Sequence, residues 1–156
     1  MVKAQASILV KSPQQRVFQF VAVDFATNYR RWSPEVQQLE ILTPGPLRVG
    51  SRARQVRIDQ GRRSESTFRV VALRPPIQVR FSESSEQFGI EYWMEPVGDQ
   101  TRLIFIFELK RLELCMRPFE KLIRTAVQDG AERVVRNVKR LVERESSHPM
   151  SSRKSY

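Results

Sequence analysis

Residues that could carry out chemistry are few in this chain of 156 residues. Cys115 is the only cysteine and His148 the only histidine, so one chain can build neither an intramolecular disulfide nor a Cys/His zinc site. His148 falls in the polar stretch SSHPMSSRKSY, which has no apolar periodicity to hold an imidazole beside a nucleophile. We therefore expect neither a metal site nor a serine- or cysteine-based triad.

The carboxylates do not form an obvious acid–base pair. General acid–base catalysis needs a carboxylate in a dry pocket, where its pKa is shifted. The acidic residues fall at predicted helix starts and turns or on the predicted wet face of a sheet: Asp24, Asp59, Glu83, Glu86, Glu91, Glu95 and Glu108. The six glycines are scattered, without the spacing of a phosphate-binding loop. These patterns predict no catalytic residue and no cofactor.

Three polar side chains are candidates for holding a ligand. Tyr92 falls on the predicted inner face of a strand, where a buried phenol needs a partner and can offer a hydrogen bond to a ligand oxygen. Gln55 and Arg57 share that face in one phase of their strand, whereas the other phase places Val56 and Ile58 inside. An inward Arg57 is costly unless it is paired, and it would then suggest an anionic group on the ligand.

The hydrophobic pattern predicts the elements that must position these side chains. A strand over Gln5–Val10 precedes a short helix with Ser12 as its N-cap, and a second short helix starts near Asp24. Period-two alternation then predicts six strands, joined by spacers too short for parallel crossovers: Val36–Leu42, Ser51–Ile58, Ser64–Leu73, Ile77–Ser84, Phe88–Glu95 and Arg102–Leu112. A helix of about 25 residues follows Pro118. The order predicts an α+β fold with one antiparallel sheet.

One face of the predicted sheet is strongly aromatic and lies against the apolar stripe of the last helix. We expect these residues of the two elements to line a ligand cavity: Phe68, Phe81, Phe88, Tyr92, Met94, Phe105, Phe107, Phe119, Ile123 and Ala126. Each could equally pack as core, because a sequence does not measure unfilled volume. Gly130 costs about 1 kcal/mol relative to alanine in mid-helix, so we expect a close approach there, by the sheet more than by a ligand.

The element order and several local motifs resemble the superfamily of START-like, polyketide-cyclase-like and pollen-allergen-like domains. The matching segments lie within residues 2–145: Val10-Lys11-Ser12-Pro13, Val17-Phe18, 24–32, 44–52, Gly61-Arg62-Arg63, Arg74-Pro75-Pro76 and 98–102, followed by the closing helix. The resemblance implies a helix-grip fold, in which a curved seven-stranded sheet wraps a long C-terminal helix. It also implies two short helices between the first two strands. It places Trp32 near a cavity mouth, where Trp32 either gates the opening or plugs the core.

The chain is strongly basic, with a formal net charge of +10 and a pI near 10.6. Seven arginines lie between Arg48 and Arg69, against only Asp59 and Glu65. This segment could make weak electrostatic contact with anionic lipid or RNA, or it could be a solvated face in an arginine-biased composition. No apolar stretch approaches the roughly 18 residues of a membrane span, and the start does not look like a signal peptide. A cytoplasmic location is the default expectation.

These observations predict a single domain over residues 1–145 and a disordered basic tail over 146–156. The leading hypothesis is binding, or transport, of a hydrophobic small molecule such as a lipid, isoprenoid or polyketide. The alternative from the enzyme class is a cyclase- or aromatase-like activity in which Tyr92 or Arg57 polarises a carbonyl. A third reading is a basic module that contacts anionic lipid or RNA.

Overall fold

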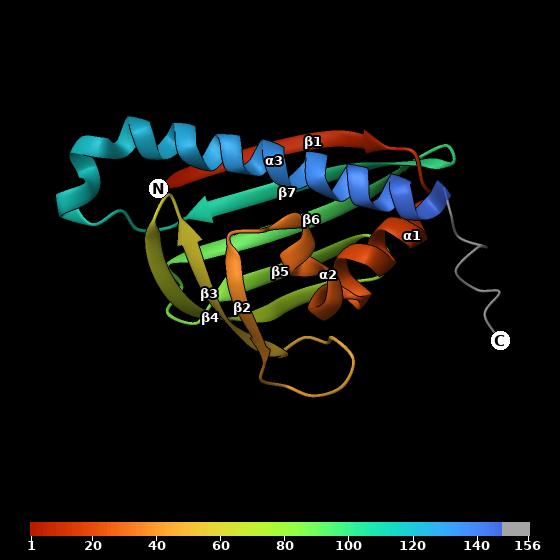
Figure 1. Cartoon of the computed structure of the whole chain (residues 1–156), viewed down its shortest axis with the longest axis horizontal. Coiled ribbons are helices and arrows are strands. Elements are labelled where there is room, and N and C mark those ends of the chain that lie inside the picture. The colour runs from red at the N-terminus through yellow and green to blue at the C-terminus, as the bar shows by residue number, and fades with distance from the viewer. Residues whose placement is uncertain (148–156) are drawn as a thin grey trace.

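The computed structural model describes residues 1–147, which adopt an α+β fold (Figure 1). Strand β1 (Val2–Val10) is followed by the short segments α1 (Gln14–Phe18), η1 (Gln19–Val23) and α2 (Phe25–Trp32). Six strands follow: β2 (Val36–Ile41), β3 (Arg52–Asp59), β4 (Arg62–Arg74), β5 (Gln78–Glu83), β6 (Phe88–Val97) and β7 (Gln100–Leu109). A 3-10 segment, η2 (Leu114–Phe119), leads into the long helix α3 (Glu120–Ser147). Helix α3 therefore includes the first two residues of the predicted tail, and the rest of that tail lies outside the described residues.

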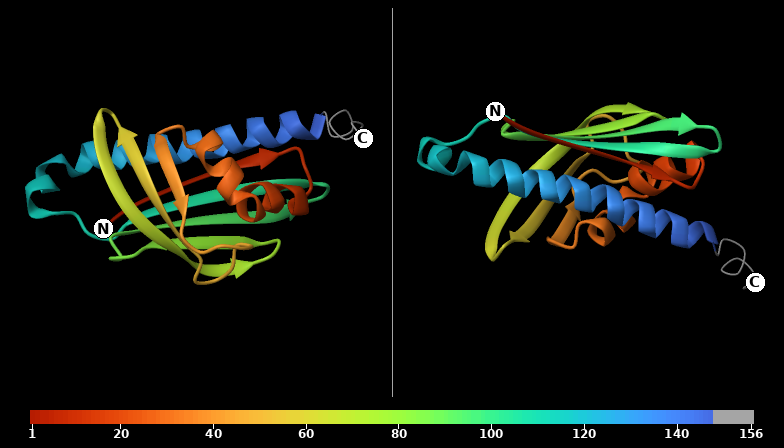
Figure 2. Two further views of the ribbon diagram at one scale, coloured as in Figure 1. Left: turned by 60° about the horizontal axis from the view of Figure 1, so that its bottom comes forward. Right: turned by 90° about the horizontal axis from the view of Figure 1, so that it is seen from above.

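The seven strands form one antiparallel sheet in the order β1-β7-β6-β5-β4-β3-β2. Neighbours in sequence pair as hairpins from β2 to β7, and β1 closes the far edge against β7. Register shifts between Val36 and Gln38 in β2, and between Val70 and Ala72 in β4, bend the sheet locally. Figure 2 shows the resulting curvature and the long helix lying across the concave side. The predicted helix-grip fold is confirmed.

Two predicted boundaries are wrong for identifiable reasons. The last strand was expected to reach Leu112, but β7 ends at Leu109, which is where both β1 and β6 run out of paired residues. Beyond that point no neighbouring strand remains to pair with the backbone. Ser12 was expected to cap the first helix, but Pro13 takes the N-cap position and no side chain caps that turn. The carbonyl of Ser12 instead accepts a hydrogen bond from Thr101 Oγ1 at 2.7 Å, which ties β1 to β7.

The short helices plug one end of the sheet with aromatic rings. Phe25 stacks on Tyr29 at 4.6 Å between ring centroids and lies 4.7 Å from Phe81 of β5. Trp32 contacts both Phe25 and Tyr29, and all four residues are buried. Edge-to-face and offset pairs of this kind add to the free energy gained from burial alone. This cluster fixes the position of α2. It thereby also fixes Tyr29 and Trp32, the two α2 side chains that line the cavity described below.

Helix α3 runs beside the free edge of β1 and satisfies backbone groups there. The carbonyl oxygens of Met1, Gln5 and Leu9 accept hydrogen bonds from Arg124, Gln128 and Lys139 at 3.0, 3.0 and 2.7 Å. An uncovered edge strand would expose these groups to pairing with other chains. The C-terminal half of α3 also buries an apolar stripe in the core, including Val135, Val138, Leu141 and Val142. The helix is thus anchored along one edge of the sheet.

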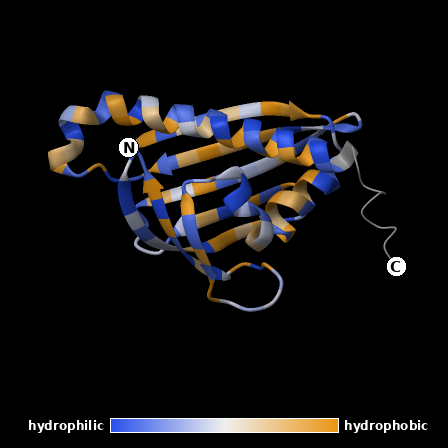
Figure 3. Cartoon of the chain, viewed as in Figure 1, coloured by the Kyte–Doolittle hydropathy of each residue, from blue (hydrophilic) through white to orange (hydrophobic). Residues whose placement is uncertain are grey.

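Segment η2 and the N-terminal end of α3 extend past the sheet and form an overhang, as Figures 1 and 3 show. Leu114, Phe119 and Leu122 in this overhang have exposed fractions of 80%, 51% and 70%.

On the outer sheet face, Ile104 and Ile106 are half-buried, and Ile104 lies opposite Trp93 in the register. Within residues 1–147, no helix combines the length and apolar character needed to cross a bilayer.

Candidate ligand-binding cavity

A cavity of about 560 Å³ lies between the inner sheet face, the end of α2 and the middle of α3. This volume is within the range of small-molecule sites in proteins, roughly 300–1,000 Å³. Eight of the expected ligand-binding residues line it: Trp32, Gln55, Arg57, Phe88, Tyr92, Phe105, Phe107 and Ala126. The structure therefore brings together, on one surface, side chains from α2, β3, β6, β7 and α3.

Five expected residues lie outside this lining. Phe68 and Phe81 belong to the aromatic cluster around Phe25 and border a separate hollow of about 80 Å³. Met94 is fully buried in the core. Phe119 is half-exposed and Ile123 half-buried, although both share the helical stripe of Ala126. Phe119 and Ile123 lie in the overhang formed by η2 and the start of α3, where no strand faces them, and Ala126 is the first of these three residues that lines the cavity.

The structure also adds lining residues that the sequence reasoning did not assign. Tyr29, Glu35 and Asn137 contribute polar atoms, and Val127 and Val134 extend the apolar stripe of α3. Gly130 lies in the same lining, one turn after Ala126. A Cβ atom built on Gly130 would meet only Arg133 Nη2, at 3.7 Å. The expectation that the sheet approaches Gly130 closely was wrong, because the cavity lies there.

The part of the cavity wall formed by β6 and β7 is largely apolar. Phe88 and Phe107, from β6 and β7, stack at 5.9 Å between ring centroids, and Phe105 lies 5.1 Å from Tyr92. Ile90 completes this patch, and Val127, Ala131 and Val134 face it from α3. A hydrocarbon or aromatic group placed here would lose its contact with water on both sides.

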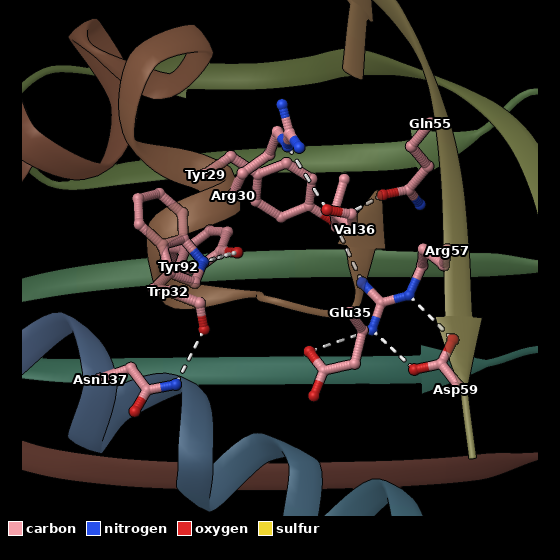
Figure 4. Close-up of polar contacts among 10 residues, drawn as sticks. All are labelled: Tyr29, Arg30, Trp32, Glu35, Val36, Gln55, Arg57, Asp59, Tyr92 and Asn137. Carbon is pink, nitrogen blue, oxygen red and sulfur yellow. Dashed lines mark hydrogen bonds and ion pairs between the residues drawn. The ribbon is translucent and has the colours of Figure 1, made fainter. Parts of the chain in front are cut away.

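Arg57 anchors the polar end of the cavity (Figure 4). Of the two strand phases left open by the sequence, the structure has Gln55 and Arg57 in the lining of the cavity, whereas Val56, although buried, and Ile58, 41% exposed, lie outside that lining. Arg57 donates two hydrogen bonds to Asp59, at 3.1 Å from Nε and 3.0 Å from Nη2, and one to the Tyr29 hydroxyl at 3.4 Å. Its Nη2 also lies 3.8 Å from Glu35 Oε1.

Burial disfavours the charged form of Arg57, but the hydrogen bond to Asp59 and the nearby Tyr29 and Glu35 outweigh it, so the pKa of Arg57 is raised. The guanidinium is thus permanently charged and already paired. A bidentate Arg–carboxylate contact is among the strongest hydrogen-bonded pairs in proteins.

Tyr92 presents the least committed polar atom of the lining. Its hydroxyl oxygen accepts a hydrogen bond from Trp32 Nε1 at 3.3 Å, and the Trp32 carbonyl accepts one from Asn137 Nδ2 at 3.0 Å (Figure 4). No acceptor for the Tyr92 O–H occurs in the described part of the chain. Burial raises the pKa of Tyr92, so the phenol stays protonated at neutral pH. Tyr92 can therefore donate a hydrogen bond to an oxygen inside the cavity.

Trp32 is 1% exposed, so its ring packs as core while one side of it lines the cavity. The second phenol, Tyr29, is committed: it donates to Gln55 Oε1 at 2.7 Å, and Gln55 Nε2 donates to Ser66 Oγ at 3.1 Å. These bonds fix the polar wall in place. The cavity is thus amphipathic, with an aromatic and aliphatic body and a polar end built on Arg57, Tyr29 and Tyr92.

A family model described as "Polyketide cyclase / dehydrase and lipid transport" matches residues 1–143. The chain belongs to this family. The match spans both walls of the cavity, from Trp32 and Arg57 to Asn137 on α3. Nothing among curated proteins matches the chain.

Solved structures share the fold over nearly their whole length. Zhui aromatase/cyclase from Streptomyces sp. R1128 is 14% identical, with a TM-score of 0.77 over 95% of this chain and 97% of its own. TTHA0849 from Thermus thermophilus is 18% identical, with a TM-score of 0.74 over 92% and 99%. A polyketide cyclase-like protein from Corynebacterium glutamicum is 20% identical, with a TM-score of 0.67 over 95% and 95%. At such identities the likeness establishes the fold alone.

Proposed function

We propose that this protein binds or transports a hydrophobic small molecule with at least one oxygen atom, held in the cavity between the sheet and α3. The observation that supports this most directly is a cavity of about 560 Å³ whose walls are largely apolar and whose polar end holds an uncommitted donor on Tyr92. Lipids, isoprenoids and polyketides all have this combination of a large apolar body and a few oxygens. The family description, which joins polyketide chemistry to lipid transport, is in accord with it.

Filling the cavity tests the proposal. Ala126 and its neighbour Thr125 are both exposed residues of α3, but only Ala126 lines the cavity. We expect Ala126→Trp to weaken the binding of the uncharged dye Nile red at least tenfold, and Thr125→Trp to leave it unchanged. Native mass spectrometry of the purified protein after incubation with a lipid or polyketide extract provides the second readout. If no bound species is seen and Nile red binds both variants alike, cavity binding is rejected.

A cyclase-like reaction is the second candidate, and one observation favours it. The Tyr92 hydroxyl is a protonated donor in a dry wall, the arrangement needed to stabilise negative charge that develops on a carbonyl oxygen. Arg57 fits this role less well because Asp59 already occupies two of its N–H groups. Tyr92→Phe separates the candidates: binding of a polyketide chain should survive, and any turnover of that chain should fall by a factor of about 100.

The basic hairpin is not proposed as an interaction surface. Arg54 pairs with Glu40 and Glu65, and Arg63 also pairs with Glu65. Arg69 pairs with Glu86. Carboxylates thus pair with four of the seven arginines between Arg48 and Arg69, counting Arg57, which argues against the continuous unpaired basic stripe that RNA or anionic lipid would require.

A further inference from the structure

The charge around the cavity is opposite to the charge of the protein. The chain carries a formal +10, yet the charged residues of the lining are mostly acidic. They are Glu35, Asp59, Glu65 and Glu83, against Arg57 and Arg133. A strongly basic protein that uses this cavity for an anionic ligand would be expected to direct free cations into it.

Arg57 is the cation that the sheet contributes to this lining, and it is not free. Its contacts with Asp59, together with the Glu35 carboxylate at 3.8 Å, place two negative charges around one positive charge. The third nitrogen, Nη1, donates to the Tyr29 hydroxyl. The polar end of the cavity therefore has a net negative charge.

Glu35 is the member of this group that can accept a ligand hydrogen bond. The distance from its carboxylate to Arg57 is too long for a hydrogen bond, and within residues 1–147 no group donates a hydrogen bond to that carboxylate. Figure 4 shows its carboxylate beside the Arg57 guanidinium, joined to it by the dashed line of the ion pair. Tyr92, 1% exposed, supplies the complementary donor from the same lining.

The remaining charged residues of the lining are bound to other partners or are solvated, so the charge of the polar end is that of the group formed by Arg57, Asp59 and Glu35. Glu83 accepts hydrogen bonds from Ser85 Oγ at 2.6 Å and Gln87 N at 3.1 Å, which keep it ionised. Glu65 is paired with Arg54 and Arg63, so it adds no negative charge to the cavity. Arg133 is exposed on α3, where water solvates its charge.

We propose that the cavity selects a ligand whose polar end is an uncharged hydroxyl, such as an alcohol or phenol, and rejects a carboxylate on the same hydrocarbon. This inference rests on the proposed function, since it specifies the ligand of the same cavity. A hydroxyl group can donate to Glu35 or accept from Tyr92, and it brings no charge. An ionised carboxylate loses its hydration and meets Glu35 and Asp59, with one guanidinium that is already paired.

A series of ligands that differ only in the head group tests this. Dodecanol, dodecanoic acid and dodecylamine are titrated at neutral pH against protein loaded with Nile red, and displacement gives their relative affinities. We expect dodecanol to bind at least about tenfold more tightly than dodecanoate, and dodecylamine to bind at least as tightly as dodecanol. Glu35→Gln should reduce the ratio of alcohol to acid affinity severalfold. Glu40→Gln removes the same charge from an exposed position, where Glu40 pairs with Arg54, and should leave the ratio unchanged.

The outcomes separate this inference from the proposed function. If Nile red does not bind and native mass spectrometry detects none of the three compounds, the proposed function fails. If all three bind and dodecanoate binds as tightly as dodecanol or more so, the cavity binds hydrophobic ligands but the head-group inference is wrong. If Glu35→Gln and Glu40→Gln alter the ratio equally, the discrimination comes from net charge and its assignment to Glu35 is overturned.

Discussion

Replacing Gly130 by alanine measures whether the cavity is open in solution. Glycine within a helix is less stable than alanine by about 0.5–1 kcal/mol, because it loses more backbone freedom on folding. The new methyl group would meet only Arg133 Nη2 at 3.7 Å, an ordinary van der Waals distance to the end of a flexible side chain. We therefore expect Gly130→Ala to raise the free energy of unfolding by nearly the full difference of about 0.5–1 kcal/mol between glycine and alanine in a helix. In a domain of this size, that corresponds to roughly 1–4 °C in Tm.

Thr125 provides the matched control for this measurement, because it is an exposed position of the same helix. The difference in unfolding free energy between Thr125→Gly and Thr125→Ala, from urea denaturation, gives the glycine-to-alanine difference in α3 without any tertiary contact. Gly130→Ala should match it within a few tenths of a kcal/mol. If Gly130→Ala is neutral or destabilising while the Thr125 pair differs normally, the sheet contacts Gly130 in solution. The cavity would then be closed at this point, and the reasoning would be refuted.

Three further changes test other parts of the structure. Tyr29→Phe leaves the buried Gln55 carbonyl without its 2.7 Å hydrogen bond and should cost about 1–3 kcal/mol in urea denaturation; no loss would mean that water replaces it. Burial raises the pKa of Glu83 but its hydrogen bonds lower it more, so its folded pKa lies below the ordinary 4.5. Its contribution to stability is complete above that ordinary value and is lost as pH falls through the folded pKa, so Glu83→Gln should flatten the acid side of the stability–pH curve. Phe107→Ala should weaken Nile red binding severalfold, whereas Phe119→Ala should not affect it, because Phe119 is half-exposed in the overhang; equal effects would place the ligand outside the cavity.

The order and type of the elements could be predicted because they depend on local patterns. Alternation along β6 placed Tyr92 and Met94 inside and Glu91 and Glu95 outside, and the exposed fractions agree. Short spacers limited the sheet to antiparallel neighbours. Strand ends were less well predicted, since β7 stops at Leu109 only because its partners stop there. Where a strand end is set by pairing with strands distant in the sequence, the local residues carry no signal for it.

The candidate site could be predicted in part, for a similar reason. Period-two patterns say which face a side chain occupies, so Phe88, Phe105 and Phe107 were placed on the cavity side. They do not say how far a helix slides along a sheet, so Phe119 was placed in the cavity although it lies in the overhang. Glu35 was not assigned to the site at all. It follows α2 in an irregular segment, where no periodicity marks an inward direction.

The sequence by itself determined the seven strands, the long helix and the aromatic face between them, because backbone hydrogen bonding and burial act with fixed periods along the chain. Only the tertiary structure decided where α3 lies, since that depends on its hydrogen bonds to the edge of β1 and on its core stripe near the C-terminus. This placement leaves unfilled space beneath Gly130. The Arg57–Asp59 pair is local, two residues apart on β3, but only the tertiary structure decided that Glu35 lies beside it, which makes the polar end of the cavity negative within a basic protein. Volume and charge balance arise from contacts between distant segments, and no local pattern records them.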